Sequence, residues 1–354
     1  MARHAGLEAT RTVAIILVVA LHAALSFMVT PIGWAIQDRS QFVGVDLIVW
    51  VLRAFGMPLF FWLSGFAARA LLERRGPSAY LRDRVLRIFL PLAVALLPMS
   101  FALDRLWAWG RDVGGRIAVA DVAPKLESSE LPIVLGHLWY LYYLLLVSFA
   151  ALAISRVLRG IKAPPGLAML AVPSAIAIGV LAYLGALHTN TPLGFVPDIP
   201  ILVLMGGFFA WGWLVHARPQ EIDRYRDRAW HALAIGGALL AVIIPSLATG
   251  RAPLYAIVAT GLFTVTMLIV FVGMCVRYAR PRAWLQLASE ASYWTYIVHL
   301  PIVVALQILL ARVAIPGVVK YAVILGVTLA VCVGSYVVVV RRLRNASRRS
   351  ANQM

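Results

Sequence analysis

The segment Gly6–Thr30, GLEATRTVAIILVVALHAALSFMVT, combines an apolar run of membrane-spanning length with two basic side chains. About 19 residues separate Thr12 from Thr30, which as a helix is close to the thickness of a bilayer core. His22 follows Arg11 by eleven positions, so both side chains are expected on one helical face, about 16 Å apart. Burial of an ionisable group at mid-depth in a membrane costs free energy, so His22 is a candidate functional residue.

Composition favours a membrane protein. The chain is 62% hydrophobic and 13% charged, against about 45–50% and about 25% in soluble proteins. Length and periodicity predict an all-α polytopic membrane protein with ten transmembrane helices around a polar cavity. The two cysteines have neither disulfide nor metal-ligand spacing, so we expect no metal. The predicted spans are 12–30, 43–68, 88–104, 132–154, 166–187, 198–216, 230–249, 254–276, 288–310 and 320–340.

The net charge of +17 is explained by topology rather than by nucleic-acid binding. If the N-terminus is cytoplasmic, the connections alternate between the two sides, and most of the 32 lysines and arginines fall on the cytoplasmic side. This asymmetry follows the positive-inside rule and predicts that both termini are cytoplasmic. We expect one integral-membrane domain over 5–345 and a basic cytoplasmic tail over 346–354.

The second span contains an arginine and a proline inside an apolar helix. Pro58 removes a backbone donor, so a kink or break is expected there, and Arg53 lies beside it. Irregular backbone at membrane depth is tolerated against protein or a watery cavity. Arg53 therefore faces either a functional polar interior or a structural partner, which would be Asp46 or a carbonyl.

Two further segments each allow two interpretations. The basic segment RALLERRGPSAYLRDRVLRIFLPL (69–92) either anchors the helices at the membrane surface or cradles phosphates, which arginine suits. The aromatic segment GHLWYLYYLLLV (136–147) forms either an interfacial belt or a stacking platform for a sugar. Between them, the polar stretch 105–131 is a candidate periplasmic lid.

The ninth span, ASEASYWTYIVHLPIVVALQILL, resembles the first in having one histidine well inside an apolar helix. Ser292, Thr295, Tyr296 and His299 have the spacing of one helical face. Pro301 follows and frees a carbonyl. His299 is therefore either a satisfied structural group or part of a polar lining.

These polar groups favour one kind of chemistry. The sequence lacks mid-membrane carboxylate pairs, a P-loop, a G-x-S-x-G elbow and an H-E-x-x-H helix. A buried neutral imidazole can act as a general base toward a hydroxyl or can accept an acyl group. An arginine on the same face could hold an anionic cofactor. This combination indicates acyl transfer from a phosphate-bearing thioester to an alcohol.

Five stretches, in order over about residues 5–310, resemble motifs of acyltransferase family 3, a family of bacterial integral-membrane O-acyltransferases. Arg11 and His22 match its R-x10-H signature, and LEATRTVAI resembles its opening, with Glu8 where aspartate is usual. FGMPLFFWLSGF, YLRDRVLRIFLPL, LWYLYYLLL and ASYWTYIVHLP resemble its later motifs. The longer form RAFGMPLFFWLSGF, which begins at Arg53, is also similar to the glucan biosynthesis protein C branch, whose members are thought to add succinyl groups to periplasmic glucans.

The resemblance implies a ten-helix protein of the bacterial inner membrane that takes acyl-CoA (acetyl-CoA or succinyl-CoA) from the cytoplasm. The acceptor would be an envelope carbohydrate, reached directly because no fused esterase-like domain is present. His22 would be the essential histidine and Arg11 its positioning or donor-binding partner. The coenzyme A phosphates would be held by Arg69, Arg82, Arg84 and Arg87. The acyl group would face Arg53, in a cavity lined by Trp139, Tyr293, Tyr296 and His299.

The sequence leaves one rival function open. Interrupted helices with buried charges are also typical of transporters. A transporter or flippase for a glycan or a lipid-linked sugar, without acyl-transfer activity, is therefore the alternative. The sequence does not indicate an oligomeric state.

Overall fold

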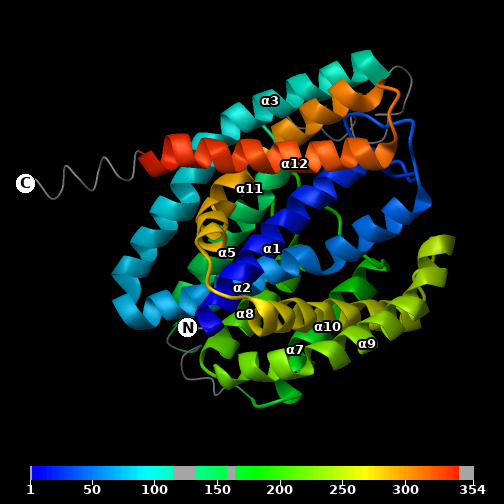
Figure 1. The fold of residues 1–354 in the computed structure, drawn as a ribbon. Helices are drawn as coiled ribbons and strands as arrows, with labels where there is room; N and C mark the ends of the chain where they lie inside the picture. Colours follow the sequence, from blue (N-terminus) through cyan, green and yellow to red (C-terminus); the bar gives the residue numbers. More distant parts are fainter. Residues whose placement is uncertain (1, 115–132, 156, 158–163, 343–354) are drawn as a thin grey trace, which may run out of the picture. The chain divides into compact units, whose positions relative to one another are not determined.

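The structure, a computed structural model, describes residues 2–114, 133–155, 157 and 164–342, and the side chains of all of these but 2–4. Within these ranges the chain is helical and has no strand (Figure 1). The part of the candidate lid over 115–131 and the tail 346–354 lie outside the described residues. The elements are α1 (Ala2–Ala24), η1 (Leu25–Phe27), α2 (Val43–Arg84), η2 (Val85–Phe89), α3 (Leu90–Gly114), η3 (Gly136–Leu138), α5 (Trp139–Ala153), α7 (Ala168–Leu184), α8 (Ile199–His216), α9 (Gln220–Thr249), α10 (Leu254–Tyr278), α11 (Ala283–Ala311), α12 (Gly317–Ser335) and η4 (Tyr336–Arg341).

The prediction of an all-α polytopic membrane protein is confirmed. Among the described residues, eight helical stretches are long and apolar enough to cross a membrane. One of them, Val43–Gly114, contains two of the predicted spans, and the shorter apolar helix Ala168–Leu184 corresponds to a third. Each of the ten predicted spans therefore coincides with a helix.

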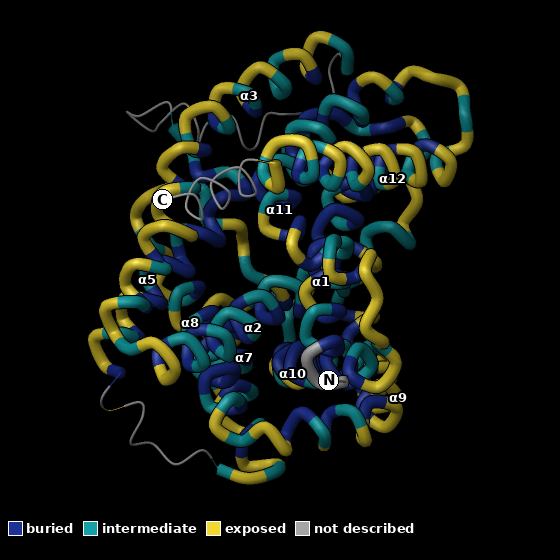
Figure 2. The backbone as a smooth tube through the Cα atoms, turned by 60° about the vertical axis from the view of Figure 1, so that its left-hand side comes forward, coloured by how far each residue is buried: buried dark blue, intermediate teal, exposed yellow. Residues whose placement is uncertain are grey.

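Exposed apolar side chains show how these helices suit a lipid environment. On α12, Val319, Val323, Val327 and Val331 recur every fourth residue and are all exposed, and Figure 2 shows exposed residues along this helix. In water such a stripe would leave a contiguous apolar surface unburied. Against acyl chains it carries no such cost, because lipid is as apolar as valine.

The chain forms two compact units. The first contains residues 1–10, 53–97 and 134–280, and the second contains residues 11–52, 98–133 and 281–354. In the first unit α9 and α10 pack along each other, and in the second α11 packs against α12. The single domain over 5–345 stays a prediction, and the two units are described separately below.

In the first unit, two glycines let α2 and α8 approach to backbone contact. A Cβ atom on Gly65 would lie 1.9 Å from the carbonyl oxygen of Phe209, and one on Gly212 would lie 1.9 Å from that of Trp62. No side chain fits at such distances, so the close crossing requires glycine at both positions. This crossing sets the positions of the polar residues that follow Gly65 on α2 and Gly212 on α8.

A kink or break was predicted at Pro58, and helix α2 does not break there. Pro58 lacks the N–H that would bond the carbonyl of Ala54. The hydroxyl of Thr264, on α10, donates to that carbonyl at 3.1 Å and satisfies it. The non-helical backbone of α2 lies at Gly76 (φ 77°, ψ 177°), a conformation that glycine adopts readily, and Pro77 follows.

Candidate active site and candidate anion site

In the second unit, the two membrane histidines contact each other. The Nε2 atom of His299 lies 3.2 Å from the Nδ1 atom of His22, and the ring centroids are 5.0 Å apart. His22 Nδ1 also lies 2.9 Å from the carbonyl oxygen of Val18. His299 is fully buried and His22 is partly buried. The sequence placed each histidine on a polar helical face but did not predict that they meet.

The neighbouring carbonyls determine which nitrogen of each ring carries the proton. His299 Nδ1 lies 3.0 Å from the carbonyl oxygen of Thr295 and 2.8 Å from that of Tyr296. Both neighbours only accept hydrogen bonds, so Nδ1 is protonated and the Nε2 of neutral His299 is an acceptor. His22 Nδ1 therefore faces two acceptors, Val18 O and His299 Nε2, and must itself be the donor. This leaves Nε2 of His22 as the nitrogen that can take a proton.

Other predicted residues of this unit are placed at different depths. Tyr296 is buried, with its ring centroid 6.2 Å from that of His299. Tyr293 is 37% exposed, and Arg11 is exposed, eleven residues before His22 on α1. The structure therefore groups Tyr296 with the two histidines and leaves Tyr293 at the surface of this unit.

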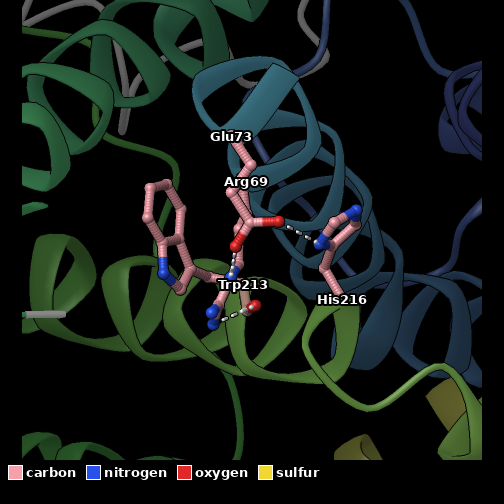
Figure 3. Close-up of polar contacts among 4 residues, drawn as sticks. All are labelled: Arg69, Glu73, Trp213 and His216. Atoms are coloured by element: carbon pink, nitrogen blue, oxygen red, sulfur yellow. Dashed lines mark hydrogen bonds and ion pairs between the residues drawn. The ribbon is translucent and has the colours of Figure 1, made fainter. Parts of the chain in front are cut away.

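In the first unit, Arg69 belongs to a cluster that joins α2 to α8 (Figure 3). Arg69 Nε donates to Glu73 Oε1 at 2.6 Å, and Arg69 Nη1 donates to the carbonyl of Trp213 at 3.4 Å. Glu73 Oε2 lies 3.5 Å from His216 Nδ1. Arg69 is only 8% exposed, so the carboxylate stabilises a cation that burial would otherwise penalise. The sequence analysis predicted Arg69 but missed Glu73 and His216.

A second arginine cluster lies further along α2 and η2. Arg84 is buried over the ring of Tyr80, with 4.9 Å between its Cζ atom and the ring centroid, and pairs with Asp83 at 3.1 Å. Arg87 is exposed and pairs with the other oxygen of Asp83 at 3.1 Å, and Arg82 is exposed. Among the described residues Arg84 Nε, although buried, has no hydrogen-bond partner. An unmet buried donor beside exposed cations is suited to an anion.

Arg53 contacts a backbone carbonyl rather than an acid. Its Nη2 atom donates to the carbonyl of Thr189 at 3.1 Å, one of the two structural partners that the sequence allowed. The other, Asp46, accepts hydrogen bonds from the backbone N–H groups of Val29 and Thr30. Loss of hydration, and then the positive charge of Arg53, lower the pKa of the neighbouring His188, although part of its surface stays exposed.

The aromatic segment at the start of α5 holds the loop between α7 and α8. Tyr142 donates to the carbonyl of Phe195 at 2.8 Å, and the hydroxyl of Tyr143 accepts from the backbone N–H of Asp198 at 2.7 Å. Trp139 is 8% exposed and packs edge-on against Tyr143. Its role in binding a sugar stays a prediction.

Comparison with known proteins identifies the family. A family model described as an acyltransferase domain, that of acyltransferase family 3, matches residues 4–337. No curated protein and no solved structure matches the chain. Because the family match covers nearly the whole sequence, this protein belongs to acyltransferase family 3 and is a membrane acyltransferase.

Proposed function

We propose that this protein moves an acyl group, acetyl or succinyl, from cytoplasmic acyl-CoA to a hydroxyl of a cell-envelope glycan, with His22 as the general base. In this proposal it lies in the bacterial inner membrane with both termini in the cytoplasm, as its charge distribution predicts. Family membership supports acyl transfer. The observation that carries the role of His22 is its contact with His299, with 3.2 Å between Nδ1 of His22 and Nε2 of His299.

The pair is suited to proton transfer because its members share a hydrogen bond and each ring also contacts backbone carbonyls. When Nε2 of His22 takes a proton, the cation still donates from Nδ1 to Val18 O and to the Nε2 lone pair of His299. His299 keeps its own Nδ1–H on the carbonyls of Thr295 and Tyr296. The arrangement therefore stabilises the imidazolium without any rearrangement of protons in His299.

The reaction follows from this base. Nε2 of His22 removes the proton of the acceptor hydroxyl while its oxygen attacks the thioester carbonyl carbon. The carbon–sulfur bond then breaks, and the leaving thiolate takes the proton from the imidazolium. The products are the glycan ester and coenzyme A, and His22 returns to its neutral form.

For the donor, we propose that Arg69, Arg82, Arg84 and Arg87 bind the phosphates of coenzyme A. The buried Arg84 Nε supports this role, since a phosphate oxygen would satisfy it. We assign Arg53 to the acyl group, where its guanidinium would pair with the carboxylate of a succinyl chain. Tyr293, Tyr296, His299 and Trp139 would line the acyl and acceptor sites, and Arg11 would position the donor below His22.

The test uses purified protein in lipid nanodiscs with acetyl-CoA or succinyl-CoA and an envelope glycan fraction. Thiol release and mass spectra of the glycan report transfer. We expect His22→Ala to lower transfer by roughly 10²- to 10⁴-fold and to keep acyl-CoA binding. The matched control is His231→Ala, which changes an exposed histidine on α9 and should leave transfer unchanged.

Two results would contradict the proposal. If His22→Ala transfers at the wild-type rate, then His22 is not the base. If the wild type transfers neither group but moves the glycan across a proteoliposome membrane, the transporter is the correct function. An acyl-histidine trapped by acid quenching would instead make His22 the acyl carrier.

A further inference from the structure

The catalytic candidate His22 lies at the very end of its helix. Helix α1 ends at Ala24, and a short 3-10 turn, Leu25–Phe27, follows. Carbonyls in the last turn of a helix have no partner within the helix. The carbonyls of His22 and Ala23 belong to this turn, so the position of the imidazole depends on what holds them.

Both carbonyls are bound by one buried amide on α11. Gln307 Nε2 donates to His22 O at 2.9 Å and to Ala23 O at 3.1 Å. Gln307 is 2% exposed and lies among apolar neighbours, with Val303 and Val304 before it and Ile308 after it. A buried amide without hydrogen bonds would cost free energy, so these contacts fix its orientation.

The other end of the same amide holds a tryptophan against the imidazole. Trp34 Nε1 donates to Gln307 Oε1 at 2.8 Å. The Trp34 ring stacks on that of His22, with centroids 6.0 Å apart and an interplanar angle of 26°. Trp107 packs edge-on against Trp34 at 5.2 Å. Gln307 therefore contacts both the backbone that carries His22 and the ring that packs on it.

We propose that Gln307 is a positioning residue for His22, acting through the end of α1 and through Trp34. The inference rests on the proposed function of His22 as the base. Gln307 does not touch the reacting atoms. It holds the imidazole in register with His299, so that Nδ1 stays the donor and Nε2 stays the base.

Two substitutions test the donor end and the acceptor end of the Gln307 amide separately. Gln307→Met keeps a similar volume and removes every hydrogen bond, so kcat should fall by about tenfold or more, with the donor KM unchanged. Gln307→Glu keeps the acceptor for Trp34 but places an acceptor against two carbonyls. Only its protonated form can donate to them, so the activity of Gln307→Glu relative to wild type should rise as the pH is lowered.

A double-mutant cycle tests the link through Trp34. Trp34→Phe keeps a stacking ring and removes the N–H, and its effect on kcat should largely vanish in the Gln307→Met background. Trp294→Phe is the matched control, because Trp294 Nε1 donates to Ser335 Oγ at 2.9 Å from the same helix. This control should leave kcat and the pH profile unchanged.

A readout that needs no acyl transfer distinguishes this proposal from the proposed function. Spectra of ¹⁵N-histidine protein in bilayers, with His22 assigned by its loss in His22→Gln, should show one tautomer in wild type and a mixture in Gln307→Met. The proposal fails if the tautomer, kcat and pH profile all stay unchanged while only the folded fraction falls. A single wild-type tautomer without acyl transfer would refute only the proposed function.

Discussion

The His22–His299 pair and the Arg69–Glu73–His216 cluster both contain histidine, but their partners differ. In the second unit, each imidazole of the pair contacts backbone carbonyls and the other imidazole. In the first unit, Glu73 lies between a buried arginine and His216 (Figure 3). One site therefore joins two imidazoles to backbone carbonyls, and the other joins an arginine and a histidine to a carboxylate.

This difference indicates different uses. An imidazole can exchange a proton with a bound hydroxyl, and a second imidazole beside it can fix its orientation. A buried arginine fixed by a carboxylate stays cationic and can exchange that carboxylate for another anion. In the proposed function, proton transfer belongs to the second unit and anion binding to the first, and the predictions below test this division.

The largest effect is expected when the His22–His299 pair is broken. His299→Leu removes the imidazole acceptor at His22 Nδ1 and leaves the Val18 carbonyl there. The ring is then held less firmly, so kcat should fall by roughly 10²-fold while the donor KM changes little. Steady-state kinetics over a range of pH measure both quantities. His216→Leu is the comparison variant, and it should change kcat far less. Equal losses of kcat in both variants would mean that the two histidine sites do not differ in function.

A smaller effect is expected in the charged cluster. Arg69→Met should raise the KM for acyl-CoA by about tenfold and leave kcat nearly unchanged, because an anion-binding cation acts before the chemical step. Arg75→Met changes an exposed arginine on the same helix and serves as the control. Glu73→Gln removes the competing carboxylate, so it should lower this KM. If Arg69→Met left KM unchanged, Arg69 would have only a structural role.

The sequence predicted most of the fold because apolar length and charge asymmetry are local properties. Each predicted span coincides with a helix, and the R-x10-H spacing identified α1 as the helix to examine. Of the kink or break predicted at Pro58, the break does not occur. The sequence could not show that Thr264, 206 residues further on, donates to the freed Ala54 carbonyl.

The partners of the site residues were harder to predict. Gln307 is one polar residue within the apolar run VVALQILLA, so the sequence could have marked it as a candidate. The sequence does not indicate which residues it contacts. Its contacts with Trp34 and His22 join residues more than 270 positions apart. The Gly65–Gly212 crossing, which places Arg69 beside Trp213, likewise depends on helix packing that no local pattern encodes.

The smallest expected effect concerns Arg53, which shares one feature with each of the two sites compared above. It is a cation like Arg69, and its partner is a backbone carbonyl, as for the two histidines. Loss of hydration, and then the charge of Arg53, lower the pKa of His188 below its usual value. The unfolded chain binds this proton more readily, so the contribution to stability is present above the usual imidazole pKa and is lost as the pH falls toward the lower folded value. Arg53→Met removes the second cause, so the pKa of His188 should rise, yet stay below its usual value. Histidine NMR titration, assigned with His188→Gln, measures this shift. If the pKa of His188 does not change, the charge of Arg53 does not act on this loop. That result would contradict the contact between Arg53 and Thr189.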